Sequence, residues 1–117
     1  MLHNRRKALQ YGRFAENFSA LFLLIKGWKI IALRYRNPFG EIDIIASRKN
    51  LVIFVEVKAR KTVHAAIDSI SYTSRKRIRT AGEAWIAKQI NGQYLSYRYD
   101  IIAVTPWRLP KHLPDAF

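Results

Sequence analysis

The amino-acid sequence predicts an α/β sandwich, in which one sheet is covered by helices on both faces. Three observations support this prediction. The expected elements run helix, three strands, helix, strand, and a strand meander with helices packed on it forms such layers. The strand expected at residues 51–57 is apolar on both faces, as in a sheet covered on both sides. Half of the 117 residues are hydrophobic, which is enough for a packed core in a single domain.

A first helix is expected from Asn4, a favourable N-cap residue, to about Lys26. Its apolar residues roughly follow the three-and-four spacing of a helix with a broad buried face. Gly27 is suited to end this helix, because glycine readily adopts the left-handed conformation found just after a helix.

Three strands are expected next, as an antiparallel meander. Residues 28–35 are rich in isoleucine and aromatic residues and form the first strand, and residues 37–40 form a turn. Residues 41–47 and 51–58 form the second and third strands, with a hairpin turn at residues 48–50.

A second helix is expected after a polar loop. Residues 59–71 form this loop, which has room for one short helix. Thr73 or Ser74 would begin the long helix, which runs to about Ile90 and ends at Asn91-Gly92.

The last expected element is a strand at residues 97–104. Three prolines follow it, so residues 106–117 are expected to form an irregular tail. The domain itself is therefore expected to span residues 1–105.

The composition points to a polyanionic partner. The chain has 21 Lys and Arg against 8 Asp and Glu, a net charge of +13, which favours nucleic acid first and an anionic membrane surface second. The absence of cysteine excludes disulfides and cysteine zinc sites, and we expect a cytoplasmic protein. The longest apolar stretch, residues 18–25, is far shorter than a membrane span, so no membrane partner and no signal peptide are expected.

Acidic residues stand inside two strands that otherwise look buried. The sequences are Gly40-Glu41-Ile42-Asp43 and Phe54-Val55-Glu56-Val57-Lys58. A charge in a buried strand costs several kcal/mol unless it is paired or binds a metal. If the hairpin is symmetric about residues 49–50, Asp43 lies directly opposite Glu56, with Cβ atoms about 5 Å apart.

Two carboxylates this close repel each other, and a divalent cation would remove the conflict. The motif offers only oxygen ligands, which favours Mg²⁺ or Mn²⁺. Such a metal keeps positions for water and a phosphate oxygen, and Lys58 could neutralise the phosphate. The alternative is structural: Asp43 and Glu56 would pair with Lys58 and Arg60 at the end of the sheet.

Basic side chains accompany the acidic strands and the second helix. The candidates for nucleic-acid contact are Arg36, Arg60, Arg75, Lys76, Arg77 and Arg79. Contacts of this kind to phosphates position a duplex without reading its sequence. The alternative is that they form an ordinary solvated basic face.

Asp43 and Glu56-Val57-Lys58 resemble the Asp and Glu-x-Lys core of the PD-(D/E)XK nuclease superfamily. More narrowly, the chain resembles the YraN family of predicted endonucleases, which is related to Holliday-junction resolvases. This second resemblance rests on Gly12, Glu16, Gly27, residues 40–43, residues 54–60 and Arg98-Tyr99-Asp100. It covers about residues 11–104. It implies a restriction-endonuclease-like α/β/α sandwich with a central mixed sheet.

The resemblance also implies a role for each site residue. Asp43 and Glu56 would hold Mg²⁺ or Mn²⁺, with the backbone carbonyl of Val57 completing the site, and Lys58 would be the catalytic lysine. Glu16, on the first helix, resembles an acid that related resolvases bring to the edge of the metal site. The alternative for Glu16 is a solvated helix carboxylate.

The expected function is metal-dependent hydrolysis of phosphodiester bonds, in DNA rather than RNA and above all in branched or structured DNA. The alternative is a DNA- or RNA-binding module that kept the fold without the chemistry. A homodimer is expected by analogy, because cutting both strands of a junction usually needs two active sites. The chain departs from the family at Arg34, where members usually have asparagine.

Overall fold

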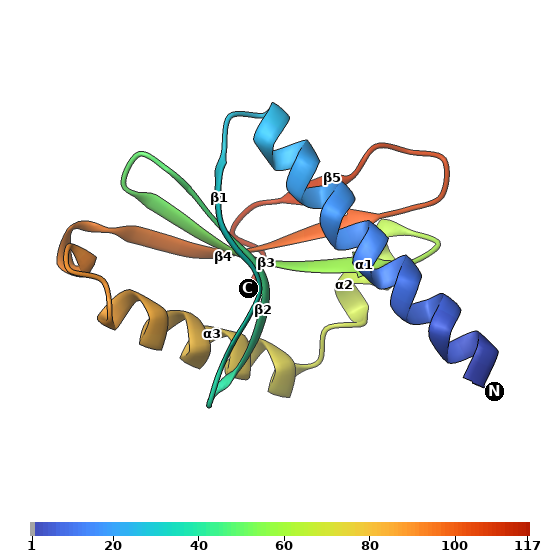
Figure 1. The fold of residues 1–117 in the computed structure, drawn as a ribbon, viewed down its shortest axis with the longest axis horizontal. Coiled ribbons are helices and arrows are strands. Elements are labelled where there is room, and N and C mark those ends of the chain that lie inside the picture. The colour runs from blue at the N-terminus through green and yellow to red at the C-terminus, as the bar shows by residue number, and fades with distance from the viewer. Residues whose placement is uncertain (1) are drawn as a thin grey trace.

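The computed structural model describes the backbone of residues 2–117 and the side chains of residues 5–117. It contains a five-stranded sheet whose strands lie in sequence order, β1 to β5 (Figure 1). The elements are α1 (Leu2–Ile25), β1 (Lys29–Asn37), β2 (Gly40–Arg48), β3 (Leu51–Ala59), α2 (Val63–Asp68), α3 (Tyr72–Ala87), the 3₁₀-helix Gly92–Tyr94, β4 (Ser96–Val104) and β5 (Lys111–Leu113).

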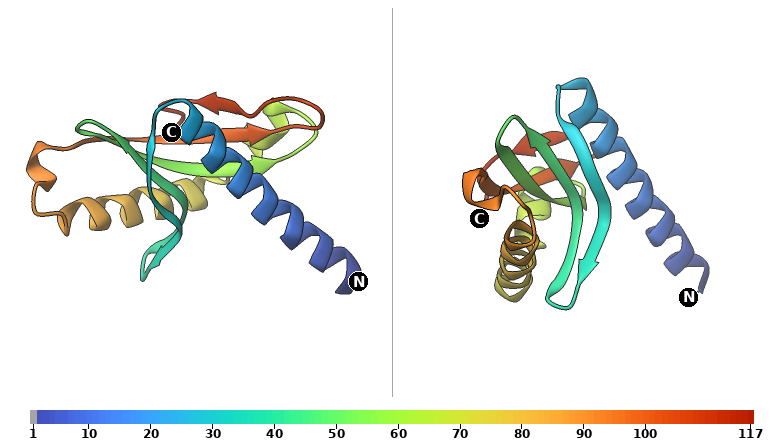
Figure 2. Two further views of the ribbon diagram at one scale, coloured as in Figure 1. Left: turned by 45° about the horizontal axis from the view of Figure 1, so that its top comes forward. Right: turned by 60° about the vertical axis from the view of Figure 1, so that its left-hand side comes forward.

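The sheet is mixed, as the family resemblance implies. β1, β2 and β3 form the antiparallel meander, β3 and β4 are parallel, and β5 pairs antiparallel with β4. α1 lies on one face of the sheet and α3 on the other (Figure 2). The predicted α/β sandwich with a central mixed sheet is therefore confirmed.

Two hydrophobic clusters fill the spaces between these layers. On the α1 side, Leu23 and Trp28 pack with Ile53 and Val55 of β3. On the α3 side, Phe54 of β3 belongs to a second cluster of buried hydrophobic residues, which includes Ile78 of α3. Because side chains alternate along a strand, the apolar run Leu51–Val55 of β3 contributes to both clusters.

The helix ends follow local hydrogen bonding. α1 begins at Leu2, so the predicted cap Asn4 lies inside the helix instead. The predicted end at Gly27 is confirmed: Gly27 has φ 95°, and the Trp28 N–H donates to the Leu23 carbonyl. α3 is capped by Ser71, whose hydroxyl accepts from the Ser74 N–H at 3.1 Å, rather than by Thr73 or Ser74.

α3 ends at Ala87, earlier than the predicted Ile90. The N–H groups of Lys88 and Gln89 reach back only three residues, so the last turn tightens and leads into the 3₁₀-helix.

The segment after β4 is not an irregular tail, contrary to the prediction. Lys111–Leu113 form β5 on the outer edge of β4, and the Ala116 N–H donates to the Tyr99 carbonyl at 2.8 Å. Pro110 and Pro114 flank β5 without lying inside it, so they remove none of its edge hydrogen bonds. The ring of Phe117 stacks on Tyr99, 5.7 Å between centroids, which ties this segment to the α3-side core.

The tip of the β1–β2 hairpin rests on α3. The side-chain amide of Asn37 donates to the Ala81 carbonyl at 3.1 Å, and a Cβ on Gly40 would lie 3.4 Å from the Arg77 carbonyl oxygen. The Asn37 side chain also accepts from the N–H groups of Phe39 and Gly40, which shapes the turn. β2 is thus held by β3 along one half and by α3 at its tip.

The N-terminal half of α1 extends past the edge of the sheet (Figures 1 and 2). Apolar Leu9, Tyr11 and Phe14 are exposed there. Within the described residues, no helix has the length and apolar character needed to cross a membrane.

Candidate metal centre

The centre forms where β2 and β3 part. Their ladder runs from Arg48↔Leu51 at the hairpin turn to Ile44↔Val55 and ends there. Continued by one residue, this register would place Asp43 opposite Glu56, as predicted for a hairpin symmetric about residues 49–50. The Val57 N–H donates to Asp43 Oδ2 at 2.8 Å, so a side chain takes over where backbone pairing stops.

A pocket of about 340 Å³ opens at this point. It is lined by Ala8, Tyr11, Gly12, Ala15 and Glu16 of α1, by Asp43, and by residues 56–60. A Cβ added to Gly12 would meet no atom within 4 Å, which shows how open this side of the pocket is. Small residues on α1 therefore leave space above the carboxylates.

Burial dominates the electrostatics of Asp43. It raises the pKa of this carboxyl from 3.8 to about 8, with the charge of Glu56 as the next cause. The Val57 N–H acts in the opposite direction, and Glu16 adds a smaller increase to the pKa. Burial also raises the pKa of Glu56, against the effect of the Lys58 ammonium. The pair therefore retains a proton at neutral pH when no cation is bound.

The structural alternative accounts for only one of these carboxylates. Lys58 Nζ lies 3.4 Å from Glu56 Oε1, an ion pair as that alternative expects. Asp43 has no basic partner within ion-pair distance among the described side chains. Arg60 lines the pocket, but its guanidinium donates to the Ala59 carbonyl, at 2.8 Å. Among the described side chains, the Asp43 carboxylate is thus buried beside another acid with a backbone N–H as its partner but no cation.

Glu16 lines the same pocket and is not the freely solvated helix carboxylate of the alternative. Its Oε2 lies 3.1 Å from Arg34 Nη1, and its side chain is 17% exposed. The sequence reasoning gave Arg34 no role in the site. It has φ 49°, a left-handed conformation that asparagine adopts more readily than arginine. The sequence feature that could have pointed to Arg34 is its departure from the asparagine usual at this position in the family.

The donor set fits a hard divalent cation, though only in part. Asp43 and Glu56 supply carboxylate oxygens in one pocket, where a cation would replace the shared proton. No group of three or more His, Cys, Asp or Glu residues in the described part of the chain is arranged to hold a metal ion. Glu16 stays with Arg34, so a metal here would have two acidic ligands from the protein.

The predicted nucleic-acid residues fall into three places. Arg60 borders the carboxylate pocket. Arg36 and Arg77 line a groove of about 460 Å³ at the hairpin tip, and Lys76 borders the next groove beside Arg77. Arg36 also pairs with Glu41, at 3.2 Å.

Arg75 and Arg79 are engaged within the fold. Arg75 donates to the carbonyls of Ile67 and Ile70, which joins α2 to α3. Both guanidinium groups lie over the ring of Phe117, at 5.6 and 5.7 Å. The basic residues predicted on α3 therefore fall into two groups. Lys76 and Arg77 line the grooves at the hairpin tip, and Arg75 and Arg79 pack against the C-terminal segment.

Comparison with known proteins identifies the family. Residues 15–104 match the sequence model described as "Uncharacterised protein family UPF0102". A UPF0102 protein of Rhizobium etli (strain CFN 42) is 56% identical over 113 residues, 97% of this chain and 93% of the relative. UPF0102 proteins of Rhizobium meliloti strain 1021 and Agrobacterium fabrum strain C58 are 53% and 46% identical, over 95% and 98% of this chain and 91% and 94% of theirs. The chain belongs to the UPF0102 family.

Proposed function

We propose that this member of the UPF0102 family is a metal-dependent endonuclease that hydrolyses phosphodiester bonds in DNA. The resemblance to the YraN family of predicted endonucleases supports branched or otherwise structured DNA as its substrate. The cofactor would be Mg²⁺ or Mn²⁺, because the donors are oxygen atoms only.

One observation carries the proposal. Asp43 and Glu56 lie in one pocket, buried so close together that the pair keeps a proton at neutral pH, with Lys58 beside them. Such an arrangement lowers the stability of the fold and has no structural benefit of its own. Strongly raised carboxyl pKa values in a pocket are typical of functional sites.

The residues divide the chemistry among them. Asp43 and Glu56 would hold the cation, together with the Val57 carbonyl oxygen. When bound, the cation supplies a nucleophilic water and neutralises charge on the phosphate. The Val57 N–H fixes the Asp43 carboxylate through Oδ2. Lys58 would hold its charge next to the reacting phosphate and lower the energy of the transition state.

Glu16 would act at the edge of the same pocket. Its charge already raises the pKa of Asp43 and of Glu56. Released from Arg34, it would add a third acidic group on the α1 side.

The charge of the chain supports nucleic acid as the substrate. The net charge is +13, and Arg60 stands at the mouth of the carboxylate pocket. Arg36, Lys76 and Arg77 offer further phosphate contacts around the hairpin tip. Two copies would be needed to cut both strands of a junction, in line with the expected homodimer.

A second candidate is a nucleic-acid-binding module without chemistry. One observation favours it: Glu16 is paired with Arg34, and the described residues contain no group of three acids arranged to hold a metal ion. This candidate predicts salt-sensitive binding of DNA without metal-dependent turnover.

Cleavage assays separate the two candidates. Labelled four-way junction, flap, single-stranded and linear duplex DNA are incubated with Mg²⁺ or Mn²⁺ and with the wild type, Glu56→Gln or Asp43→Ala. Glu83→Gln, which removes an exposed carboxylate on α3, is the matched control. We expect cleavage by the wild type and the control, and none by the two pocket variants, which should still bind DNA. Binding by the wild type without cleavage of any substrate would favour the second candidate.

A further inference from the structure

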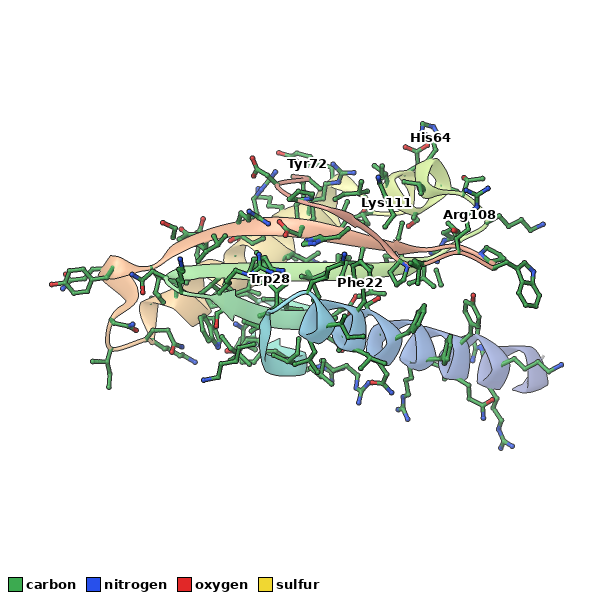
Figure 3. All side chains as sticks on the ribbon, turned by 90° about the horizontal axis from the view of Figure 1, so that it is seen from above. Phe22, Trp28, His64, Tyr72, Arg108 and Lys111 are labelled. Carbon is green, nitrogen blue, oxygen red and sulfur yellow. The ribbon has the colours of Figure 1, made fainter. Side chains whose placement is uncertain are left out.

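A second pocket lies at the opposite end of α1. Its volume is about 460 Å³, and it is lined by Phe22, Lys26, Trp28, Arg48, Arg98, His112 and Pro114. These residues come from the end of α1, the start of β1, the end of β2, β4 and the C-terminal segment. Figure 3 labels Phe22 and Trp28, which lie close together between α1 and the sheet. The lining includes three permanent cations and one histidine but no acidic side chain.

A buried acid behind the pocket fixes two of its basic groups. Asp100 is fully buried, and its carboxylate accepts from Arg98 Nε at 3.0 Å and lies 2.7 Å from His112 Nε2. The Asp115 N–H donates to it as well, at 2.9 Å. These hydrogen bonds hold the pKa of Asp100 below its usual value despite burial. Arg98 and His112 are therefore held in place by a buried carboxylate that is charged at neutral pH.

Trp28 fixes the third basic group. The guanidinium of Arg48 lies 4.3 Å over the Trp28 ring, and that of Arg98 lies 5.8 Å from it. Arg48 also donates to the Lys26 carbonyl at the end of α1. Stacking uses the face of a guanidinium and leaves N–H groups at its edge for another acceptor.

The burial of Trp28 restricts what the pocket can bind. Its side chain is 6% exposed, so it has no open face on which a nucleobase could stack. The accessible chemistry is that of the cations. Lys26, Arg48 and Arg98 carry three positive charges, and Asp100 offsets one of them. The two positive charges that remain are enough to neutralise a singly charged phosphodiester.

We propose that this pocket binds a phosphate group of a nucleic-acid backbone, away from the carboxylate pocket. The inference rests on the proposed function in taking nucleic acid as its ligand. Both pockets border α1, and Arg48 stands five residues along β2 from Asp43. That separation is about 17 Å, or roughly five phosphates along one strand of a duplex. The pocket would therefore hold DNA that continues beyond the cleavage site.

The first test follows individual N–H signals by NMR, without divalent metal. The reporters are the Trp28 indole N–H and the Nε–H groups of Arg48 and Arg98; the comparison signals are Nε–H groups of Arg75 and Arg79 on α3. We expect a short DNA duplex to shift the reporters in a saturable way, and inorganic phosphate to shift the same reporters at higher concentration. Shifts caused by phosphate but not by DNA would overturn nucleic acid as the ligand. Reporters unmoved by both probes would overturn the site.

The second test removes charge and measures how DNA binding depends on salt. Lys26→Gln with Arg48→Gln should reduce the slope of log K against log salt by about two phosphate contacts. Lys26→Gln alone changes an exposed side chain and should reduce it by about one, even if Arg48 proves necessary for folding. The control, Lys88→Gln with Arg108→Gln, removes the same charge from exposed positions elsewhere and should leave the slope nearly unchanged. Equal losses in Lys26→Gln and in a single control substitution would refute a specific site.

These tests stand apart from the cleavage assays. They measure binding without metal, so DNA can still shift the reporter signals even if the protein cleaves no DNA. Conversely, the wild type can cleave DNA and Glu56→Gln fail to do so, while DNA and phosphate leave the reporter signals unchanged. In that case the proposed function stands and only the second pocket's role is refuted.

Discussion

Replacing Asp43 with asparagine should make the protein more stable at alkaline pH. Asp43 is buried beside Glu56, and its pKa rises to about 8. The folded protein therefore keeps a proton that the unfolded chain releases near the ordinary aspartate pKa of 3.8. Asparagine is neutral at every pH, and its side-chain oxygen can still accept from the Val57 N–H.

The sign and size follow from proton linkage. For an acid with a raised folded-state pKa, stability is greatest below the unfolded pKa and falls as the pH rises towards about 8. One proton contributes at most about 1.4 kcal/mol per pH unit, so the wild type should lose about 2 to 4 kcal/mol between pH 5 and pH 8. Asp43→Asn should avoid this loss.

Urea denaturation at several pH values, with a chelator present, measures the effect. We expect the two proteins to be similar near pH 5 and the variant to be more stable by about 2 to 4 kcal/mol at pH 8. Asp68→Asn is the control, because Asp68 is exposed on α2 and its only described partner is His64. Adding Mg²⁺ should stabilise the wild type at pH 8 and leave the variant unchanged.

A variant that is no more stable than the wild type at pH 8 would refute this reasoning. So would a wild-type stability that rises between pH 5 and pH 8 relative to the variant. Either result would mean that the pocket solvates Asp43 far better than its burial indicates.

Three further predictions concern single side chains. Lys58→Met should reduce cleavage by about 100- to 1,000-fold with little change in DNA affinity, and equal losses in rate and affinity would contradict a role in the transition state. Gly82→Ala should destabilise the fold by about 1 to 3 kcal/mol, because a Cβ would lie 2.9 Å from the Tyr99 ring. Gly12→Ala, in open space, should stabilise the fold by about 0.5 to 1 kcal/mol. Urea midpoints that change in the same direction in both variants would refute this contrast. Asp100→Asn should cost about 3 kcal/mol at neutral pH, and since the pKa of Asp100 is depressed, the difference from the wild type should shrink as the pH falls through the acid range; a difference independent of pH would be contrary to this account.

Short-range rules predicted the central part of the fold. A two-residue turn at residues 49–50 sets the register of β2 and β3, and strand alternation then brings Asp43 and Glu56 together. The apolar character of both faces of β3 predicted a covered sheet in the same way.

Other parts depend on contacts that no local pattern encodes. Glu16 meets Arg34 only because α1 crosses beside β1, and Arg75 finds its carbonyl partners only after α2 has folded against α3. The C-terminal segment has three prolines and a weak strand pattern, and it becomes ordered through pairing with β4 and through the Asp100 hydrogen bonds. Tertiary contacts override weak propensities at all these positions.

The contact between the hairpin tip and α3 has a mechanical consequence. Asp43 is the first residue of β2 beyond its ladder with β3, and the strand then continues to a tip held by Asn37 and Gly40 against α3. Glu56 is held by the parallel ladder to β4. The two carboxylates therefore sit on separately supported parts of the molecule. If a strand of nucleic acid bound in the groove beside Lys76 and Arg77, a displacement of the hairpin tip would change the distance between the two carboxylates and therefore how well they could hold a cation.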